Sequence, residues 1–243
     1  MHPVKKIPVR MKYYVSQWIG KIFGKRFFWD LEALFKPKDA ILSGCKNEED
    51  FFRQGEKDVE YLEKLNLVNK ETVSLHLGCG IGRMERFLAP KVKEAYGIDI
   101  SKVMIKKAQK MVQFPNVHFF DTNGKDLKLF KDQTFTLIYS FFVFQHLSRT
   151  VVMGYMQEAA RVLRINGYFL CQFQYRGEDE IVEDPDESHP WGIRLYNIQD
   201  VTALGDEANL TIKEIYNLEE AQLLRSQGAE HGECNVWVLY QKV

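Results

Sequence analysis

Residues 75–82, which read L-H-L-G-C-G-I-G, constrain the fold of this chain more than any other stretch. An apolar, β-branched lead-in runs into three glycines spaced two apart, Gly78, Gly80 and Gly82, and M-E-R-F-L-A follows with a helical pattern. This order predicts a buried strand, a tight turn and the start of a helix. Glycine reaches positive φ without strain, and a helix N-terminus offers unpaired N–H groups. We therefore expect a ligand-binding turn here.

The spacing of the glycines narrows the kind of ligand. A dinucleotide motif needs a third glycine where this chain has Arg83, and a phosphate-binding P-loop needs a G-K-[ST] ending that is absent. Asp99 instead lies 17 residues after Gly82, at the carboxyl end of the next predicted strand. A carboxylate there can accept hydrogen bonds from both ribose hydroxyls. The turn and Asp99 together predict a nucleoside in the crevice beyond the strand ends.

Strands and helices alternate along the rest of the chain. Asn47, Ser101 and Ser148 are suited to cap helices, and Pro90 is expected to end the helix that follows the glycines. Further strands are predicted at 92–100, 117–120 and 135–139 and after the turn at 166–167. This alternation predicts an α/β fold with a mostly parallel sheet and helices on both faces.

The C-terminal part does not continue the alternation of strands and helices. Residues 197–208 are helical in pattern, and 210–217 and 235–241 are strand-like. A long loop or irregular helix over 218–233 would let these last two strands pair antiparallel.

Composition narrows the class of protein. The 243 residues, 45% of them hydrophobic, suit one domain with an appendage, and zero net charge gives no argument for nucleic acid. Four scattered cysteines without a C-x-x-C pair favour reduced thiols in a cytoplasmic protein, with neither a disulfide framework nor a metal site. The chain has no apolar run of about 20 residues for a membrane span, and its start lacks a signal peptide's apolar core.

The N-terminal part is basic and aromatic. Residues 1–38 hold nine basic and two acidic residues, and 11–35 predict one or two amphipathic helices before a connector at 37–46. We expect residues 1–46 to form a helical extension and 47–243 the main domain. Three roles are compatible with the extension: packing on the main domain, a substrate lid, or a basic face that contacts a membrane surface or an acidic partner.

Five stretches in order resemble a known family. H-L-G-C-G-I-G-R, Y-G-I-D-I-S, N-G-K-D-L, F-T-L-I-Y-S-F-F-V-F-Q-H-L and A-A-R-V-L-R-I-N-G-Y-F-L are similar to the motifs of class I S-adenosylmethionine-dependent methyltransferases, most of all the single-domain bacterial small-molecule branch. The resemblance covers residues 50–243. It implies a Rossmann-like, seven-stranded sheet of order 3-2-1-4-5-7-6 whose last strand is antiparallel.

The resemblance also implies a cofactor, S-adenosylmethionine, with S-adenosylhomocysteine as product. Gly78, Cys79 and Gly80 would pass beneath its methionine part, while Asp99 would hold the ribose with Ile100 against the adenine. The remaining contacts would come from Asn123 and Gly124 at the adenine edge and from Ser140 and Phe141 at the methionine amino group. His76 stands where the family has an acid that anchors the cofactor's ammonium, and hydrogen bonds could satisfy the histidine as a tolerated substitution.

The acceptor side is less defined by the sequence. His146, in Q-H-L after the fourth strand, is a candidate base for a hydroxyl acceptor or a positioning residue, and it could equally be part of the pocket wall. Gln145 is a second candidate for that pocket. An acidic loop over 175–194 supplies the other substrate candidates, Glu183, His189, Trp191 and Arg194, although such loops are often merely solvated.

The sequence thus predicts a methyltransferase acting on an oxygen or nitrogen atom of a small molecule. It has no D-P-P-Y or N-P-P-Y motif and no P-C nucleophile, so a nucleic-acid substrate is disfavoured. Two alternatives stay open. One is a binding or regulatory module that keeps the pocket without turnover, and the other is an RNA- or membrane-associated enzyme recruited by residues 1–38.

Overall fold

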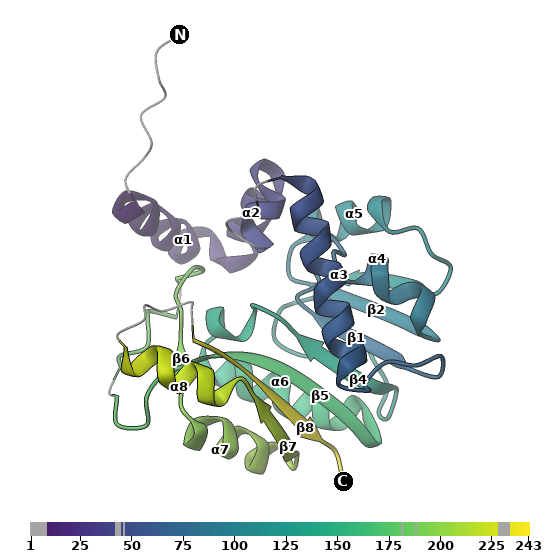
Figure 1. Ribbon diagram of the computed structural model, residues 1–243. Coiled ribbons are helices and arrows are strands. Elements are labelled where there is room, and N and C mark those ends of the chain that lie inside the picture. The colour runs from purple at the N-terminus through teal and green to yellow at the C-terminus, as the bar shows by residue number, and fades with distance from the viewer. Residues whose placement is uncertain (1–8, 42–44, 46, 181, 188, 228–233) are drawn as a thin grey trace.

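A computed structural model describes residues 9–41, 45, 47–180, 182–187, 189–227 and 234–243. Its centre is a single sheet with the strand order β3-β2-β1-β4-β5-β8-β7 and a short β6 beside β5 (Figure 1). The strands are β1 (Val73–Leu77), β2 (Glu94–Asp99), β3 (Val117–Asp121), β4 (Phe135–Ser140), β5 (Leu163–Tyr175), β6 (Leu195–Tyr196), β7 (Thr211–Tyr216) and β8 (Asn235–Gln241).

The predicted topology is confirmed. Strands β1 to β5 pair in parallel, and β8 pairs antiparallel with both β5 and β7. The two-residue β6 is additional to the seven predicted strands, so the last two strands are numbered β7 and β8.

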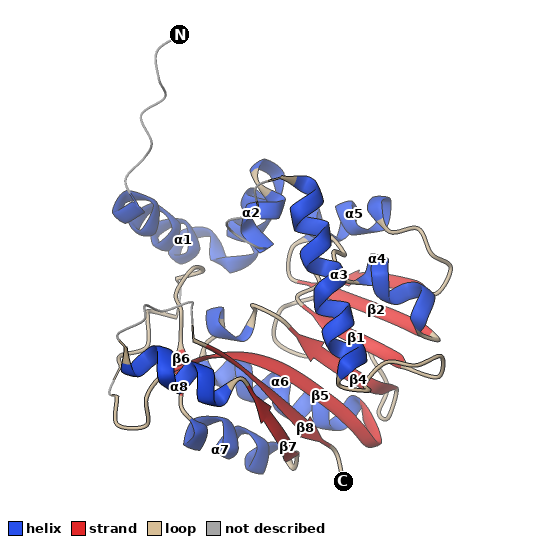
Figure 2. Cartoon of the chain, in the orientation of Figure 1, coloured by secondary structure: helices blue, strands red, loops and turns tan. Residues whose placement is uncertain are grey.

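Helices cover both faces of the sheet, with α3 on the near side and α6 and α7 behind in Figure 2. Successive residues of β4 explain the two layers. Leu137 and Tyr139 pack in one cluster with residues of α3 and α4, while Ile138 packs in another with residues of α6 and α7. The helices are α1 (Val9–Phe35), α2 (Pro37–Ile41), α3 (Glu48–Lys64), α4 (Glu85–Leu88), α5 (Lys102–Met111), α6 (Arg149–Val162), α7 (Ile198–Ala208) and α8 (Leu218–Ser226), with 3-10 turns η1 (Ala89–Lys91) and η2 (Phe144–His146).

The predicted helix caps are present. The side chains of Asn47, Ser101 and Ser148 each accept a hydrogen bond from a backbone N–H in the first turn of α3, α5 and α6. Such a bond satisfies one of the N–H groups that a helix start leaves unpaired. Asn197 starts α7 with a reciprocal capping box.

Two local expectations were wrong. The connector after α1 contains the short helix α2. Strand β5 begins at Leu163, before the turn-like residues, because the pairing with β4 shifts register there. For residues 218–233 the prediction allowed a long loop or an irregular helix, and the structure has helix α8 over Leu218–Ser226; residues 228–233 lie outside the described residues.

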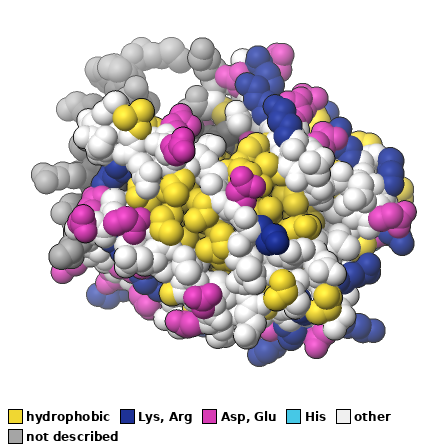
Figure 3. Space-filling view, turned by 60° about the horizontal axis from the view of Figure 1, so that its bottom comes forward, with side chains coloured by type: hydrophobic (Ala, Val, Ile, Leu, Met, Phe, Trp, Pro, Cys, Tyr) yellow, Lys and Arg dark blue, Asp and Glu magenta, His cyan; other side chains and the backbone are white. Residues whose placement is uncertain are grey.

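Part of the sheet is only partly covered by the described residues. Three aromatic side chains on the α3 side are only partly buried: Tyr168 of β5, Tyr216 of β7 and Trp237 of β8. They pack against the core cluster that contains Leu137 and Tyr139, and the last two also contact the Tyr61 ring. Figure 3 shows hydrophobic side chains gathered in one area on the lower face of the molecule as drawn in Figure 1.

The N-terminal extension packs on the main domain. Helix α1 bends at Gly24, whose φ is 82°, and Phe28 and Ala33 are buried behind the bend. Asp30 Oδ1 accepts hydrogen bonds from Ser101 Oγ at 2.6 Å and from the Val103 N–H at 3.1 Å. Within the described part of the chain, no helix combines the length and the apolar character that crossing a bilayer requires.

Candidate active site

A cavity of about 870 Å³ opens at the carboxyl ends of β1, β2 and β4. Open α/β sheets bind ligands at this edge. Helix α1 contributes Lys25 and Trp29 to the wall, opposite the glycine turn. Ten of the sixteen predicted site residues line it, namely Gly78, Gly80, Asp99, Ile100, Asn123, Gly124, Phe141, Gln145, His146 and Trp191.

The glycine turn is shaped so that only glycine fits. Gly78 has φ 78°, and a Cβ there would lie 2.3 Å from Val143 Cγ2. A Cβ on Gly80, with φ 56°, would lie 2.6 Å from Ile41 Cδ1. The main chain is therefore bare where it faces the cavity, which allows a ligand to approach it closely.

Asp99 is held in place by the turn that it faces. Its Oδ2 accepts a hydrogen bond from the Gly80 N–H at 3.0 Å, and its Oδ1 accepts one from the Ser101 N–H at 2.8 Å. Burial raises the pKa of Asp99, and these two N–H groups oppose that rise. Each oxygen keeps a free lone pair, so the carboxylate can still accept bonds from a diol.

Asn123 and Gly124 lie in the turn after β3, on the same side of the cavity as Asp99. The Asn123 Oδ1 already accepts hydrogen bonds from the N–H groups of Lys125 and Asp126, at 2.8 and 3.2 Å, and its Nδ2 donates to Asp126. The Asn123 side chain therefore shapes this turn.

His76 lies outside the cavity lining. Its Nδ1 is 2.6 Å from Glu85 Oε1, which also accepts a hydrogen bond from the Tyr139 hydroxyl at 3.1 Å, and the two rings stack. All three side chains are buried, and burial together with Glu85 raises the pKa of Tyr139. The acidic side chain at this place is therefore Glu85 of α4, which contacts His76 of β1.

Cys79 and Ser140 also lie outside the lining. The Cys79 thiol is buried, which raises its pKa, and the Ser140 hydroxyl donates to the Leu77 carbonyl at 3.1 Å. These side chains support the turn, whereas their neighbours Gly78, Gly80 and Phe141 line the cavity.

His146 forms the far wall of the cavity together with Gln145. Its Nδ1 lies 3.2 Å from the Gly192 carbonyl and its Nε2 lies 3.1 Å from Gln145 Nε2. These partners select the tautomer in which Nδ1 donates and Nε2 accepts. Burial lowers the pKa of His146 to about 4, and the nearby cations Lys25 and Arg194 act in the same direction. The ring is therefore neutral at pH 7.

Two tryptophans complete this wall. The ring centroids of Trp29 and Trp191 are 5.0 Å apart, and each lies about 6 Å from the His146 ring. Lys25 Nζ donates to the His146 carbonyl at 3.1 Å, and burial lowers its pKa to about 8. Sequence reasoning missed Lys25 and Trp29 as site residues, since their only signal was the mixture of aromatics and lysines in 11–35.

Residues 75–171 match a family model described as a methyltransferase domain. A phosphoethanolamine N-methyltransferase from Haemonchus contortus has a TM-score of 0.67 at 16% identity, over 98% of this chain and 51% of that one. A SAM-dependent methyltransferase from Aquifex aeolicus has a TM-score of 0.54 at 18% identity, over 76% of this chain and 89% of that one. Residues 75–171 thus match a methyltransferase domain, and the chain has the same fold as these two methyltransferases.

A curated relative, the uncharacterized methyltransferase YcgJ of Bacillus subtilis, is 30% identical to this chain over 140 residues. That match spans 56% of this chain and 54% of the relative, so the chain spans about half of the relative's length. The Haemonchus contortus structure is a complex with phosphoethanolamine and S-adenosylhomocysteine.

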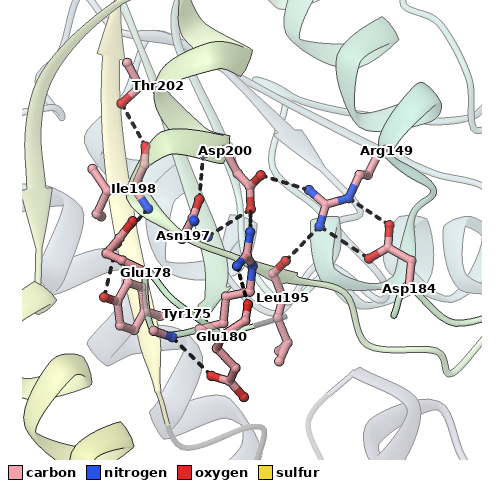
Figure 4. A network of polar contacts seen from close by, with 12 residues as sticks. Arg149, Tyr175, Glu178, Glu180, Asp184, Leu195, Asn197, Ile198, Asp200 and Thr202 are labelled. Carbon is pink, nitrogen blue, oxygen red and sulfur yellow. Dashed lines mark hydrogen bonds and ion pairs between the residues drawn. The ribbon is translucent and has the colours of Figure 1, made fainter. Parts of the chain in front are cut away.

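The acidic loop that follows β5 is held by ion pairs and hydrogen bonds to neighbouring parts of the chain (Figure 4). Asp184 pairs with Arg149, whose Nη2 also donates to the Leu195 carbonyl. Glu180 pairs with Arg225. Two of the loop's negative charges thus attach it to α6 and α8.

The other substrate candidates in this loop divide in two. Glu183 is exposed and does not line the cavity. His189 and Arg194 are buried behind the cavity wall, where His189 Nδ1 accepts from the Trp191 N–H and the Arg194 N–H donates to the Gln145 carbonyl. They position Trp191 and Gln145, which do reach the cavity.

Proposed function

We propose that this chain transfers a methyl group from S-adenosylmethionine to a nitrogen or oxygen atom of a small molecule. The observation that carries the proposal is one continuous cavity, which joins the glycine turn and Asp99 to the wall formed by His146 and Trp191. Such a cavity has room for a nucleoside and a second small ligand.

The residues at one end fit the cofactor. The bare backbone at Gly78 and Gly80 would accommodate its methionine part, and Asp99 retains lone pairs for the ribose hydroxyls. Ile100 and Gly124 would lie along the adenine. When bound, the cofactor supplies a methyl group already activated on a sulfonium, with a neutral leaving group.

The residues at the other end would position the acceptor. Because the leaving group is neutral, in-line placement is the main requirement, and Trp29, Trp191 and Gln145 provide walls for it. The Nε2 lone pair of His146 can accept a hydrogen bond from the acceptor's N–H or O–H if Gln145 shares it. A ring with a pKa of about 4 holds a proton weakly, which favours an amine acceptor that needs no base.

One neighbour is consistent with an amine acceptor. The Haemonchus contortus structure contains phosphoethanolamine, and its match extends over 98% of this chain, including the N-terminal extension. We extend the proposal accordingly: residues 1–46 form a lid on the methyltransferase domain of residues 47–243. The buried thiols of Cys79 and Cys171, which form no disulfide among the described residues, favour a cytoplasmic location.

Titration calorimetry with S-adenosylmethionine and S-adenosylhomocysteine tests the cofactor site. We expect binding of both, weakened about 10- to 100-fold in Asp99→Asn, because one charged hydrogen-bond acceptor is lost. Asp132→Asn, an exposed acid far from the cavity, is the control. Absence of heat with both ligands in the folded wild type would refute the proposal.

Turnover is tested separately with a panel of small primary and secondary amines and alcohols. Release of S-adenosylhomocysteine with at least one acceptor supports the enzyme. The engagement of both His146 nitrogens favours the alternative, a binding module without turnover. Tight cofactor binding with no product on the whole panel would favour that module over the enzyme.

A further inference from the structure

Exposed hydrophobic side chains are concentrated on α1. Six of the thirteen large, exposed hydrophobic residues in the described part of the chain belong to this one helix. We call them the outer face of α1: Trp18, Ile22, Phe23, Phe27, Leu34 and Phe35. Trp18 is 60% exposed and Phe35 is 77% exposed. Single exposed hydrophobics are ordinary, but such a concentration marks an interaction surface.

The aromatic rings of the outer face form a preorganised cluster. The Phe23 ring contacts Trp18 edge-on at 6.3 Å and Phe27 at 5.0 Å between centroids. Helix α1 already buries Phe28 and Ala33 against the main domain. The helix is therefore apolar on two sides, and the domain covers only one of them.

The stretch of chain that carries this face is basic in sequence. Residues 1–38 hold nine basic and two acidic residues. One of the two acids, Asp30, faces the main domain, where it accepts hydrogen bonds from Ser101 and Val103. Lys21 and Lys36 are exposed beside the outer face, and no ion pair joins either of them to another described residue.

Exposed hydrophobic side chains together with lysines favour one kind of partner. A second copy of the chain would bring cations against cations, so it is disfavoured by charge. An anionic bilayer offers apolar depth for the aromatic rings and negative headgroups for the lysines. We propose that the outer face of α1 docks on the surface of an anionic lipid bilayer.

The position of α1 gives this docking a consequence for the cavity. The helix turns Lys25 and Trp29 toward the cavity, while Figure 1 shows α1 with α2 at one end of the molecule, away from the sheet. A bilayer on the outer face therefore lies directly across α1 from the cavity. The docking itself does not depend on methyl transfer.

Co-sedimentation of the full chain with vesicles tests the proposal. We expect binding to phosphatidylcholine vesicles that contain phosphatidylglycerol, and at least about tenfold weaker binding to pure phosphatidylcholine. High salt should weaken the binding, because it screens the lysines. Equal binding to both kinds of vesicle, or binding to neither, would overturn the proposal.

Two variants locate the contact. Trp18→Ser/Phe23→Ser/Phe27→Ser should weaken binding to the anionic vesicles at least about tenfold, and Lys21→Glu/Lys36→Glu should do so in a salt-dependent way. The matched control removes equally exposed residues elsewhere, Leu129→Ser/Ile165→Ser/Leu223→Ser, and should bind like the wild type.

Cofactor binding separates this proposal from the proposed function. The triple aromatic variant should keep the wild-type affinity for S-adenosylmethionine by calorimetry, which also shows that it is folded. Wild-type vesicle binding by that variant would overturn the docking proposal. So would self-association of the wild type that the triple variant abolishes, because the outer face would then serve a second copy of the chain.

Discussion

Replacing His76 by Asp provides the sharpest test of how the buried cluster beneath the glycine turn works. The substitution restores the acid that the family has at this position, yet it places a second carboxylate beside Glu85. Both side chains are enclosed, with 5% and 0% of their surfaces exposed, and they lie 2.6 Å apart. The surface pair His118–Glu94 has similar geometry, at 2.8 Å, with 37% and 36% exposed.

The expected magnitude follows from this difference in burial. Two like charges about 4 Å apart repel by about 4 kcal/mol at an effective dielectric constant of 20. Removing one partner of a buried pair costs about 3–5 kcal/mol. We therefore expect His76→Asp to lower the free energy of unfolding by about 3–5 kcal/mol. His118→Asp should lower it by less than about 1 kcal/mol, because water screens that pair.

Urea denaturation of both variants measures the two losses. Exchanging the partners in His76→Asp/Glu85→His should recover much of the stability, since it keeps one acid and one imidazole in the cluster. Equal losses in the buried and exposed variants would refute the reasoning. A stable His76→Asp protein that binds S-adenosylmethionine more tightly would show that position 76 contacts the cofactor.

Three further predictions concern the glycine turn, the cavity wall and the network of Figure 4. Gly78→Ala should lower the free energy of unfolding by at least about 1–2 kcal/mol, because alanine is strained at φ 78° and its Cβ would meet Val143; Gly154→Ala, with its nearest contact at 3.5 Å, should not. His146 has a pKa of about 4 in the folded chain, so between pH 6.5 and 4 it takes up a proton in the unfolded chain but stays neutral in the folded one. The free energy of unfolding should therefore fall by up to about 3 kcal/mol over that range. His146→Gln should flatten this pH dependence. Arg149→Ala should cost about 1–3 kcal/mol and hasten proteolysis of the loop that it holds, since it strands a carboxylate and a carbonyl.

Much of the fold follows from local patterns. Side-chain caps such as Asn47 and Ser148 gave the starts of helices, and alternating strands and helices predicted the parallel sheet. The start of β5 did not follow, because a register shift against β4 decides it. Helix α2 was also missed, since no local pattern in the connector indicated it.

The candidate site divides in a similar way. The glycine turn and Asp99 are near in sequence, and their pattern alone brings them together. The contact of Lys25 with His146 joins residues 121 positions apart, so no local pattern could reveal it. The partner of His76 was nine residues away on α4, but a lone Glu85 in a helical stretch carried no signal of its own.

The hydrogen bonds of Asp30 link α1 thermodynamically to the nucleoside end of the cavity. Asp30 holds the hydroxyl of Ser101, and the N–H of Ser101 holds Asp99. A ligand that orders Asp99 should therefore also stabilise the packing of α1 on the main domain. Because coupling between two binding events is reciprocal, a partner that binds α1 in this position should raise the affinity for that ligand by the same factor. A membrane contact on one side of this helix and a nucleoside on the other would thus strengthen each other without ever touching.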